Sequence, residues 1–161
     1  MYYEIHGAGE PLILLHGGGG STEDFSEILP VLSSTRQVIA VHLQAHGRTA
    51  DNDRLLSYEA MADDIAALIK YLRIEKADVM GYSLGGGVAL LTAIQHSAVV
   101  RKLVVASAVF KRDGWYPEIL AANGTVRSSN RRADEADPDV HHVCPRCAET
   151  RRLAGAAHQA R

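Results

Sequence analysis

The sequence predicts an α/β fold in which helices flank a parallel sheet. Up to residue 122, short apolar runs typical of buried strands alternate with segments of helical spacing, which is the pattern of such a sheet. Beyond residue 122 the alternation stops. We therefore expect a folded core over residues 1–122 and a tail with little structure over residues 123–161.

Four apolar runs are expected to form the parallel strands. Each run is short, rich in aliphatic residues and followed by glycine or polar residues, as expected of a strand buried on both faces. The predicted strands are residues 11–15, 37–41, 77–80 and 102–106.

Three segments between these runs are expected to be helices. Ser21, with Asp24 three residues later, resembles a capping box, so the first helix is expected over residues 21–32. Ser57 caps a second, longer helix, and a third is expected over residues 84–96. The second helix places five apolar residues on one face: Met61, Ile65, Leu68, Ile69 and Leu72.

The composition is that of an ordinary globular protein. Of the 161 residues, 47% are hydrophobic and 22% are charged, and the formal net charge of −2 offers no electrostatic basis for binding nucleic acid. No apolar run approaches the roughly 20 residues of a membrane span, and the N-terminus lacks the features of a secretory signal. We therefore expect a cytoplasmic protein with no nucleic-acid or membrane partner.

The stretch Gly-Tyr-Ser-Leu-Gly-Gly, residues 81–86, lies where a predicted strand meets a predicted helix. Glycines two before and two after Ser83 suit a turn too tight for β-carbons, and such a turn lifts one hydroxyl clear of the backbone. In this setting the pattern G-x-S-x-G is the nucleophile elbow of serine hydrolases. The alternative is a surface serine in a glycine-rich turn.

The run His-Gly-Gly-Gly-Gly, residues 16–20, follows the first predicted strand. Its glycines leave backbone N–H groups open to a ligand, as an oxyanion hole requires. A flexible linker is the alternative, but a linker seldom lies between a buried strand and a capped helix. Together with the elbow, the run indicates nucleophilic catalysis.

With these two motifs, residues 1 to about 120 resemble the N-terminal half of an α/β-hydrolase, the family of esterases, lipases, lactonases and cofactor-free haloperoxidases. The resemblance implies that Ser83 is the nucleophile and that the N–H groups of Gly18 and Leu84 form the oxyanion hole. It implies a carboxylesterase-like enzyme that cleaves a small carboxylic ester or related acyl compound through an acyl-enzyme on Ser83. No metal or organic cofactor is implied.

The loop after the second predicted strand departs from the family's D-x-x-G-x-G pattern. His42 stands where the aspartate is usual, and Ala45 stands where the first glycine is usual. We expect both to loosen this loop beside the oxyanion hole. His46 is interpreted as a structural residue of the loop rather than as the catalytic base, since the family's base follows its last strand.

The catalytic acid and base are not identifiable in this chain. The candidates in the family's order of serine, acid and histidine are Asp137 or Asp139, followed by His141, His142 or His158. None of them stands in a strand-to-loop setting that would hold a base near the hydroxyl, so we expect a truncated core, lacking the last strands, with weak activity. The rival prediction is a non-catalytic fragment that self-associates through its open sheet edge.

The tail itself is unusual. Residues 123–161 hold seven arginines and no lysine and have no regular apolar period, so they are expected to bury little surface. Codons compatible with residues 123–127 read Met-Gly-Gln-Phe one base later, and we hypothesise that the tail is a frameshifted reading. Cys144 and Cys147 form a C-x-x-C pair, but no second ligand pair accompanies it, so we interpret it as a chance match rather than a zinc site.

Overall fold

The computed structural model describes residues 1–109 together with Gly114 and Tyr116. Residues 1–108 lie in one compact unit, and the helices and strands below belong to it. The predicted tail lies outside the described residues, together with its acid and base candidates and its cysteine pair.

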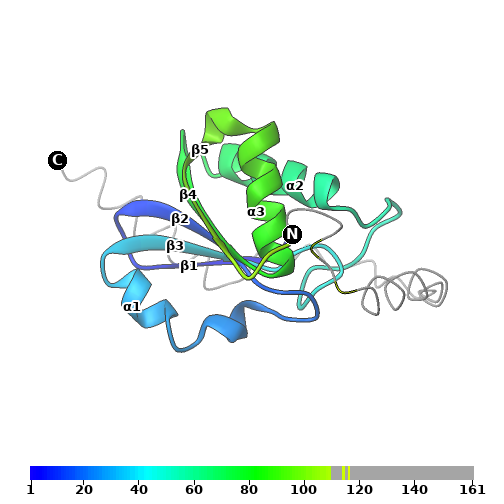
Figure 1. Ribbon diagram of the computed structural model, residues 1–161. Coiled ribbons are helices and arrows are strands. Elements are labelled where there is room, and N and C mark those ends of the chain that lie inside the picture. The colour runs from blue at the N-terminus through cyan, green and yellow to red at the C-terminus, as the bar shows by residue number, and fades with distance from the viewer. Residues whose placement is uncertain (110–113, 115, 117–161) are drawn as a thin grey trace. The chain divides into compact units, whose positions relative to one another are not determined.

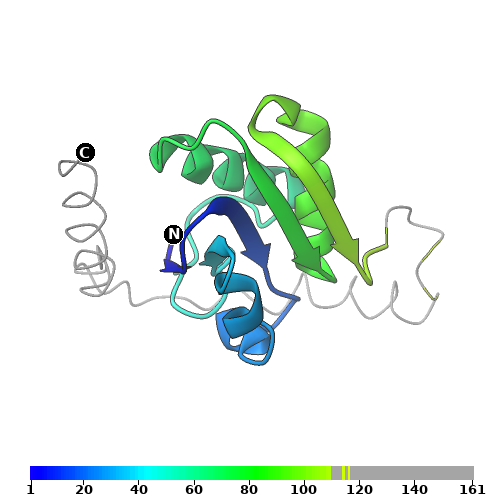
Figure 2. The ribbon, with the colours of Figure 1, turned by 90° about the vertical axis from the view of Figure 1, so that its left-hand side faces the viewer.

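Five strands form one sheet in the order β1-β3-β2-β4-β5. They are β1 (Tyr3–His6), β2 (Glu10–Leu15), β3 (Arg36–Val41), β4 (Ala77–Tyr82) and β5 (Val100–Ala106). The four strands predicted from the sequence are parallel to one another, as predicted, and Figure 2 shows β4 and β5 side by side with their arrowheads in the same direction. The strand β1 was not predicted from the sequence; it pairs antiparallel with β3 and makes the sheet mixed.

The helices confirm two of the three predictions. They are α1 (Leu29–Ser33), α2 (Tyr58–Tyr71) and α3 (Leu84–Gln95), with short 3-10 segments at η1 (Thr22–Phe25) and η2 (Ser97–Val99). The cap of α2 is the predicted one, because the Oγ of Ser57 accepts a hydrogen bond from the Ala60 N–H at 3.1 Å.

The single helix predicted over residues 21–32 is wrong, since this segment forms η1 and α1 as separate pieces. The predicted contact at its start is present: the Asp24 carboxylate accepts the N–H of Ser21 at 3.3 Å. The break has a local cause. Pro30 has no N–H to donate to the carbonyl of Ser26, whereas in the first turn of α1 this donor is not needed.

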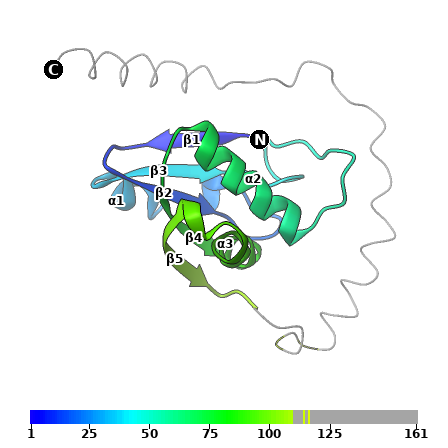
Figure 3. The same ribbon diagram turned by 90° about the horizontal axis from the view of Figure 1, so that it is seen from above.

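An apolar layer covers each face of the sheet. Successive side chains of a strand point to opposite faces, so Ile13 and Leu15 of β2 pack with α2 and α3, whereas Leu12 and Leu14 pack with Phe25 on the other side. Figures 1 and 3 show α2 and α3 together on one face of the sheet and α1 on the opposite face. The predicted apolar face of α2 lies in the first layer, with four members buried and the fifth half-buried: Met61, Ile65, Leu68, Ile69 and Leu72.

The start of α3 packs directly on the end of β2. A β-carbon added at Gly85 would lie 2.4 Å from the carbonyl oxygen of Leu15 and 2.5 Å from that of His16, both closer than atoms can approach. A β-carbon at Gly87 would lie 2.5 Å from the ring of Tyr58. Glycine at these two positions therefore lets α3 approach both the sheet and α2.

Ionic contacts join four strands at their amino ends. The side chain of Asp78 in β4 is only 6% exposed and pairs with Arg36 of β3 and Arg101 of β5. The Nε of Arg101 donates to Asp78 Oδ1 at 2.8 Å, and its Nη2 donates to Oδ2 at 3.1 Å. Arg101 also pairs with Glu10 of β2, so a single buried carboxylate lies at the centre of a contact that spans the sheet.

Candidate functional site

Ser83 occupies a strained turn between β4 and α3. Its backbone has a φ of 51° and a ψ of −114°, a left-handed conformation that residues other than glycine seldom adopt. The turn is held on both sides: the Ser83 N–H donates to the carbonyl of Ala106 at 2.9 Å, and its own carbonyl accepts from the Gly87 N–H at 3.1 Å. The half-buried side chain has no hydrogen-bond partner among the described residues.

The glycines that flank Ser83 are required by close contacts. A β-carbon added at Gly81 would lie 2.0 Å from the carbonyl oxygen of Gly85, and one at Gly85 would meet the carbonyls at the end of β2. The turn therefore has the tight geometry that the sequence predicts, and it presents the hydroxyl of Ser83 at the carboxyl end of a central strand.

The glycine run after β2 lies against this turn. The N–H of Gly85 donates to the carbonyl of His16 at 3.0 Å, and the N–H of Gly20 donates to that of Gly17 at 3.2 Å. Gly18 lies beside Leu84, because a β-carbon added at Gly18 would be 3.7 Å from the Leu84 Cβ. Within the described part of the chain, the N–H groups of Gly18 and Leu84 make no hydrogen bond. Two unused donors are thus available on segments that lie next to each other.

His16 is a buried structural histidine. Its Nε2 accepts the N–H of Leu43 at 3.1 Å, so this nitrogen carries no proton; its Nδ1 therefore carries the proton and donates to the carbonyl of Gly17 at 2.7 Å. Burial lowers the pKa of His16, which favours the neutral ring. Both nitrogens are occupied, and the ring joins the glycine run to the segment after β3.

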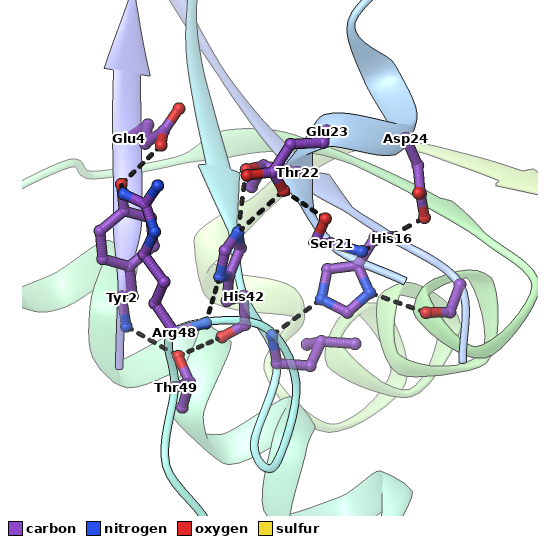
Figure 4. A network of polar contacts seen from close by, with 12 residues as sticks. Tyr2, Glu4, His16, Ser21, Thr22, Glu23, Asp24, His42, Arg48 and Thr49 are labelled. Atoms are coloured by element: carbon purple, nitrogen blue, oxygen red, sulfur yellow. Dashed lines mark hydrogen bonds and ion pairs between the residues drawn. The ribbon is translucent and has the colours of Figure 1, made fainter. Parts of the chain in front are cut away.

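His42 makes a second connection, between the loop after β3 and η1, which follows the glycine run (Figure 4). The N–H of Arg48 donates to its Nδ1 at 2.7 Å, so the proton lies on Nε2, which faces Thr22 Oγ1 at 2.9 Å. The ring is 1% exposed, and burial is the main cause that lowers the pKa of His42. The expectation that His42 would loosen the loop after β3 is wrong, because its ring binds that loop at Arg48.

The rest of the loop after β3 shows both strain and close packing. Ala45 has a φ of 60°, where glycine would be less strained. Gly47, with a φ of 53°, has no room for a side chain, since a β-carbon there would lie 2.2 Å from His42 Nδ1. The Nδ1 of His46 donates to the carbonyl of Gln44 at 2.7 Å, which agrees with a structural interpretation of that residue.

Other functional groups are limited in the part of the chain that the structure describes. No cluster of three or more histidine, cysteine, aspartate or glutamate side chains there is suited to hold a metal ion. Among the same residues, no helix is both long and apolar enough to cross a membrane.

The bonds of His42 to Thr22 and Arg48 were not predicted from the sequence. The signal that pointed toward them was the departure of His42 from the D-x-x-G-x-G pattern.

Comparison with known proteins identifies relatives of this arrangement. The model of the alpha/beta hydrolase fold family matches residues 10–148. The chain is 35% identical over 103 residues to 2-hydroxymuconate semialdehyde hydrolase of Pseudomonas sp. (strain CF600), which covers 62% of this chain and 36% of that protein. It is 42% identical over 112 residues to pimeloyl-[acyl-carrier protein] methyl ester esterase of Neisseria meningitidis, covering 68% of this chain and 34% of that protein.

A solved structure of a marine microorganism esterase superposes with a TM-score of 0.69 at 29% identity, covering 82% of this chain and 51% of the esterase. The chain therefore spans about a third of the length of these two curated relatives and about half of the esterase.

Proposed function

Because the chain belongs to the α/β-hydrolase fold family, we propose that it is a serine hydrolase that acts on small carboxylic esters or related acyl compounds. The observation that carries this proposal is the turn at Ser83. Among the described residues, neither its hydroxyl nor the neighbouring N–H groups of Gly18 and Leu84 have a hydrogen-bond partner. The names of the relatives, which include esterases, support an ester substrate.

In the proposed reaction, the Oγ of Ser83 attacks the carbonyl carbon of the ester, and the carbonyl electron pair moves onto its oxygen. The N–H groups of Gly18 and Leu84 stabilise that oxyanion, and the amino end of α3 adds its partial positive charge. Collapse of the intermediate breaks the bond to the alcohol oxygen, which leaves with a proton from solvent in exchange for the one that Ser83 releases to solvent. The acyl group stays as an ester on Ser83, which water then hydrolyses. No metal or organic cofactor takes part in these steps.

The hydroxyl proton of Ser83 needs an acceptor. His16 and His42 do not supply it, because both nitrogens of each ring are engaged in hydrogen bonds. Without a positioned base, a serine hydrolase retains a rate of roughly 10³ to 10⁴ above water, owing to the oxyanion hole and to binding. We therefore propose that the described residues by themselves give weak turnover that favours activated esters, whose leaving groups need no protonation.

Replacing Gly18 by proline is expected to lower the hydrolysis of short-chain nitrophenyl esters by about 100- to 1000-fold, or to the background rate, because proline has no N–H to donate to the oxyanion. The matched control is Gly19→Asn, in the same loop. Gly19 has a φ of 72° and no atom within 4 Å of an added β-carbon, and asparagine tolerates this conformation. If both variants lost activity equally, the loop's shape rather than the Gly18 donor would be responsible.

A second candidate is a non-catalytic fragment that binds a second copy of itself through the edge of its sheet. Among the described strands, β5 pairs with β4 alone. Its Val104 and Val105 are 50% and 39% exposed, which is unusual for aliphatic residues of a parallel strand.

If this edge pairs with another copy, light scattering at micromolar concentration should give the mass of a symmetric dimer rather than of a monomer. Val104→Lys should shift the protein to the monomer, because a charged side chain on an edge strand opposes pairing. A monodisperse monomer in the parent protein would contradict self-association.

A further inference from the structure

Three histidine rings lie close together where the glycine run meets the loop after β3. The rings of His16 and His42 meet edge to face with centroids 6.0 Å apart, and the ring of His46 lies 5.2 Å from that of His16. His16 follows β2 and His42 follows β3, two neighbouring parallel strands, so both rings lie at the carboxyl edge of the sheet. Both are fully buried.

His42 contacts the chain just after the glycine run. Thr22, which faces its Nε2, is the first residue of η1 and follows the glycine run by two positions. The Thr22 side chain is itself buried, with 4% of the residue exposed. Only three residues separate Thr22 from Gly18, and one of them, Gly20, donates its N–H to the carbonyl of Gly17 at 3.2 Å, so we expect a displacement of Thr22 to reach the backbone of Gly18.

We propose that His42 is a positioning residue for the glycine run, acting through Thr22, and that it holds the run in place only while its ring is neutral. The importance of this position for catalysis rests on the proposed function of the Gly18 N–H. The geometric basis is that one ring bonds two segments at once: it accepts from Arg48 at Nδ1 and donates to Thr22 at Nε2.

Protonation would break this arrangement. A cationic ring would carry a proton on Nδ1, directed at the N–H of Arg48 only 2.7 Å away, and two donors repel each other. Glu23, whose Oε2 lies 3.8 Å from Nε2, and Glu4 favour the cation, whereas burial, Arg48 and His46 oppose it. Two further rings face His42: His16 edge-on, and Tyr2 with its centroid at 4.7 Å.

The balance of these groups lowers the pKa of His42 from its ordinary value of 6.5. The unfolded chain therefore takes up the proton first as the pH falls below about 6.5. The stability that the neutral, buried His42 ring contributes to the folded protein is therefore complete above pH 6.5 and is lost progressively as the pH falls below it. The connection between the two segments should weaken only when the pH falls below the lowered pKa of His42 in the folded protein.

The tautomer of the ring provides a test that does not depend on activity. In protein labelled with ¹⁵N-histidine, long-range ¹H–¹⁵N spectra at pH 7.5 should show His42 protonated at Nε2 and His16 protonated at Nδ1, each assigned from the variant that lacks it. A His42 ring that is cationic, or protonated at Nδ1, at this pH would overturn the proposal.

Variants of Thr22 test the positioning role itself. Thr22→Val keeps the shape of the side chain but removes the acceptor for Nε2–H, whereas Thr22→Ser keeps the hydroxyl and is the matched control. We expect the amide resonance of Gly18 to move in Thr22→Val and in His42→Asn, which cannot reach Thr22, and to stay in place in Thr22→Ser. An unchanged Gly18 resonance in Thr22→Val would overturn the proposal.

Ester hydrolysis gives the second readout. If Gly18 acts as proposed, kcat in Thr22→Val should fall about 10- to 100-fold with a smaller change in KM, and Thr22→Ser should restore it. His42→Asn combined with Thr22→Val should cost little more than either change alone, because both remove the same bond. If the parent protein showed no hydrolysis, the proposed function would fail, while the resonance of Gly18 would still decide the role of His42.

Discussion

Replacing Ser83 by alanine is expected to remove the burst of nitrophenol that formation of the acyl-enzyme releases and to lower the hydrolysis of short-chain nitrophenyl esters toward the background rate of the buffer. The reason is that Oγ is the only side-chain atom proposed to attack the carbonyl. The oxyanion donors can still assist direct attack by water, so the variant is expected to keep the part of the rate, at most about 10³- to 10⁴-fold above water, that the oxyanion hole and binding supply without the serine.

An organophosphonate probe should label Ser83 in the parent protein and leave the Ser83→Ala variant unlabelled, as read by mass spectrometry of peptides. Ser26→Ala is the matched control, since Ser26 is exposed and stands at the end of η1. Equal ester hydrolysis in the parent and Ser83→Ala, or an adduct at Ser21 or Ser107 instead, would exclude Ser83 as the nucleophile.

Replacing Asp78 by alanine is expected to lower the free energy of unfolding by about 3–5 kcal/mol, measured by urea denaturation. The Asp78 carboxylate is 6% exposed and accepts hydrogen bonds from both Arg36 and Arg101. Its removal would leave two guanidinium groups close together at the end of the sheet without their shared counter-ion. Asp78 lies on β4, the strand that leads to Ser83. The Asp78→Ala variant should therefore lose ester hydrolysis at a lower urea concentration than the parent protein does.

The matched control for this change is Asp63→Ala. Asp63 also contacts a nitrogen-bearing side chain, with its Oδ1 2.7 Å from His96 Nε2, but its own side chain is 64% exposed, and such surface pairs contribute about 0–1 kcal/mol. A loss below about 1 kcal/mol in Asp78→Ala would show that the buried pairs add little net stability beyond a surface pair.

The elements that the sequence analysis predicted correctly are those whose signal is contained in a few neighbouring residues. The cap at Ser57 and the apolar face of α2 follow from helical spacing, and the parallel strands follow from aliphatic runs. The strand β1 was missed because its four half-buried residues alternate polar and apolar side chains too briefly to stand out. It is a strand because the edge of β3 is there to pair with it.

The helix over residues 21–32 shows the opposite error. The contact of Ser21 with Asp24 is local and was predicted correctly. The extent of the helix was not, because Pro30 suits the first turn of a new helix better than the interior of a long one. The pair Ser21 and Asp24 therefore predicts where a helical segment begins but not how long it is.

For the candidate site, the sequence by itself determined the two glycine motifs and Ser83 between a strand and a helix, because a tight turn needs glycine at positions counted along the chain. Only the tertiary structure decided that Gly18 lies beside Leu84 and that His42 meets Thr22. These contacts join residues 66 and 20 positions apart, and they exist because β2 lies between β3 and β4 in the sheet. Neighbouring parallel strands bring their following loops to one edge, and no local pattern specifies which loops those will be.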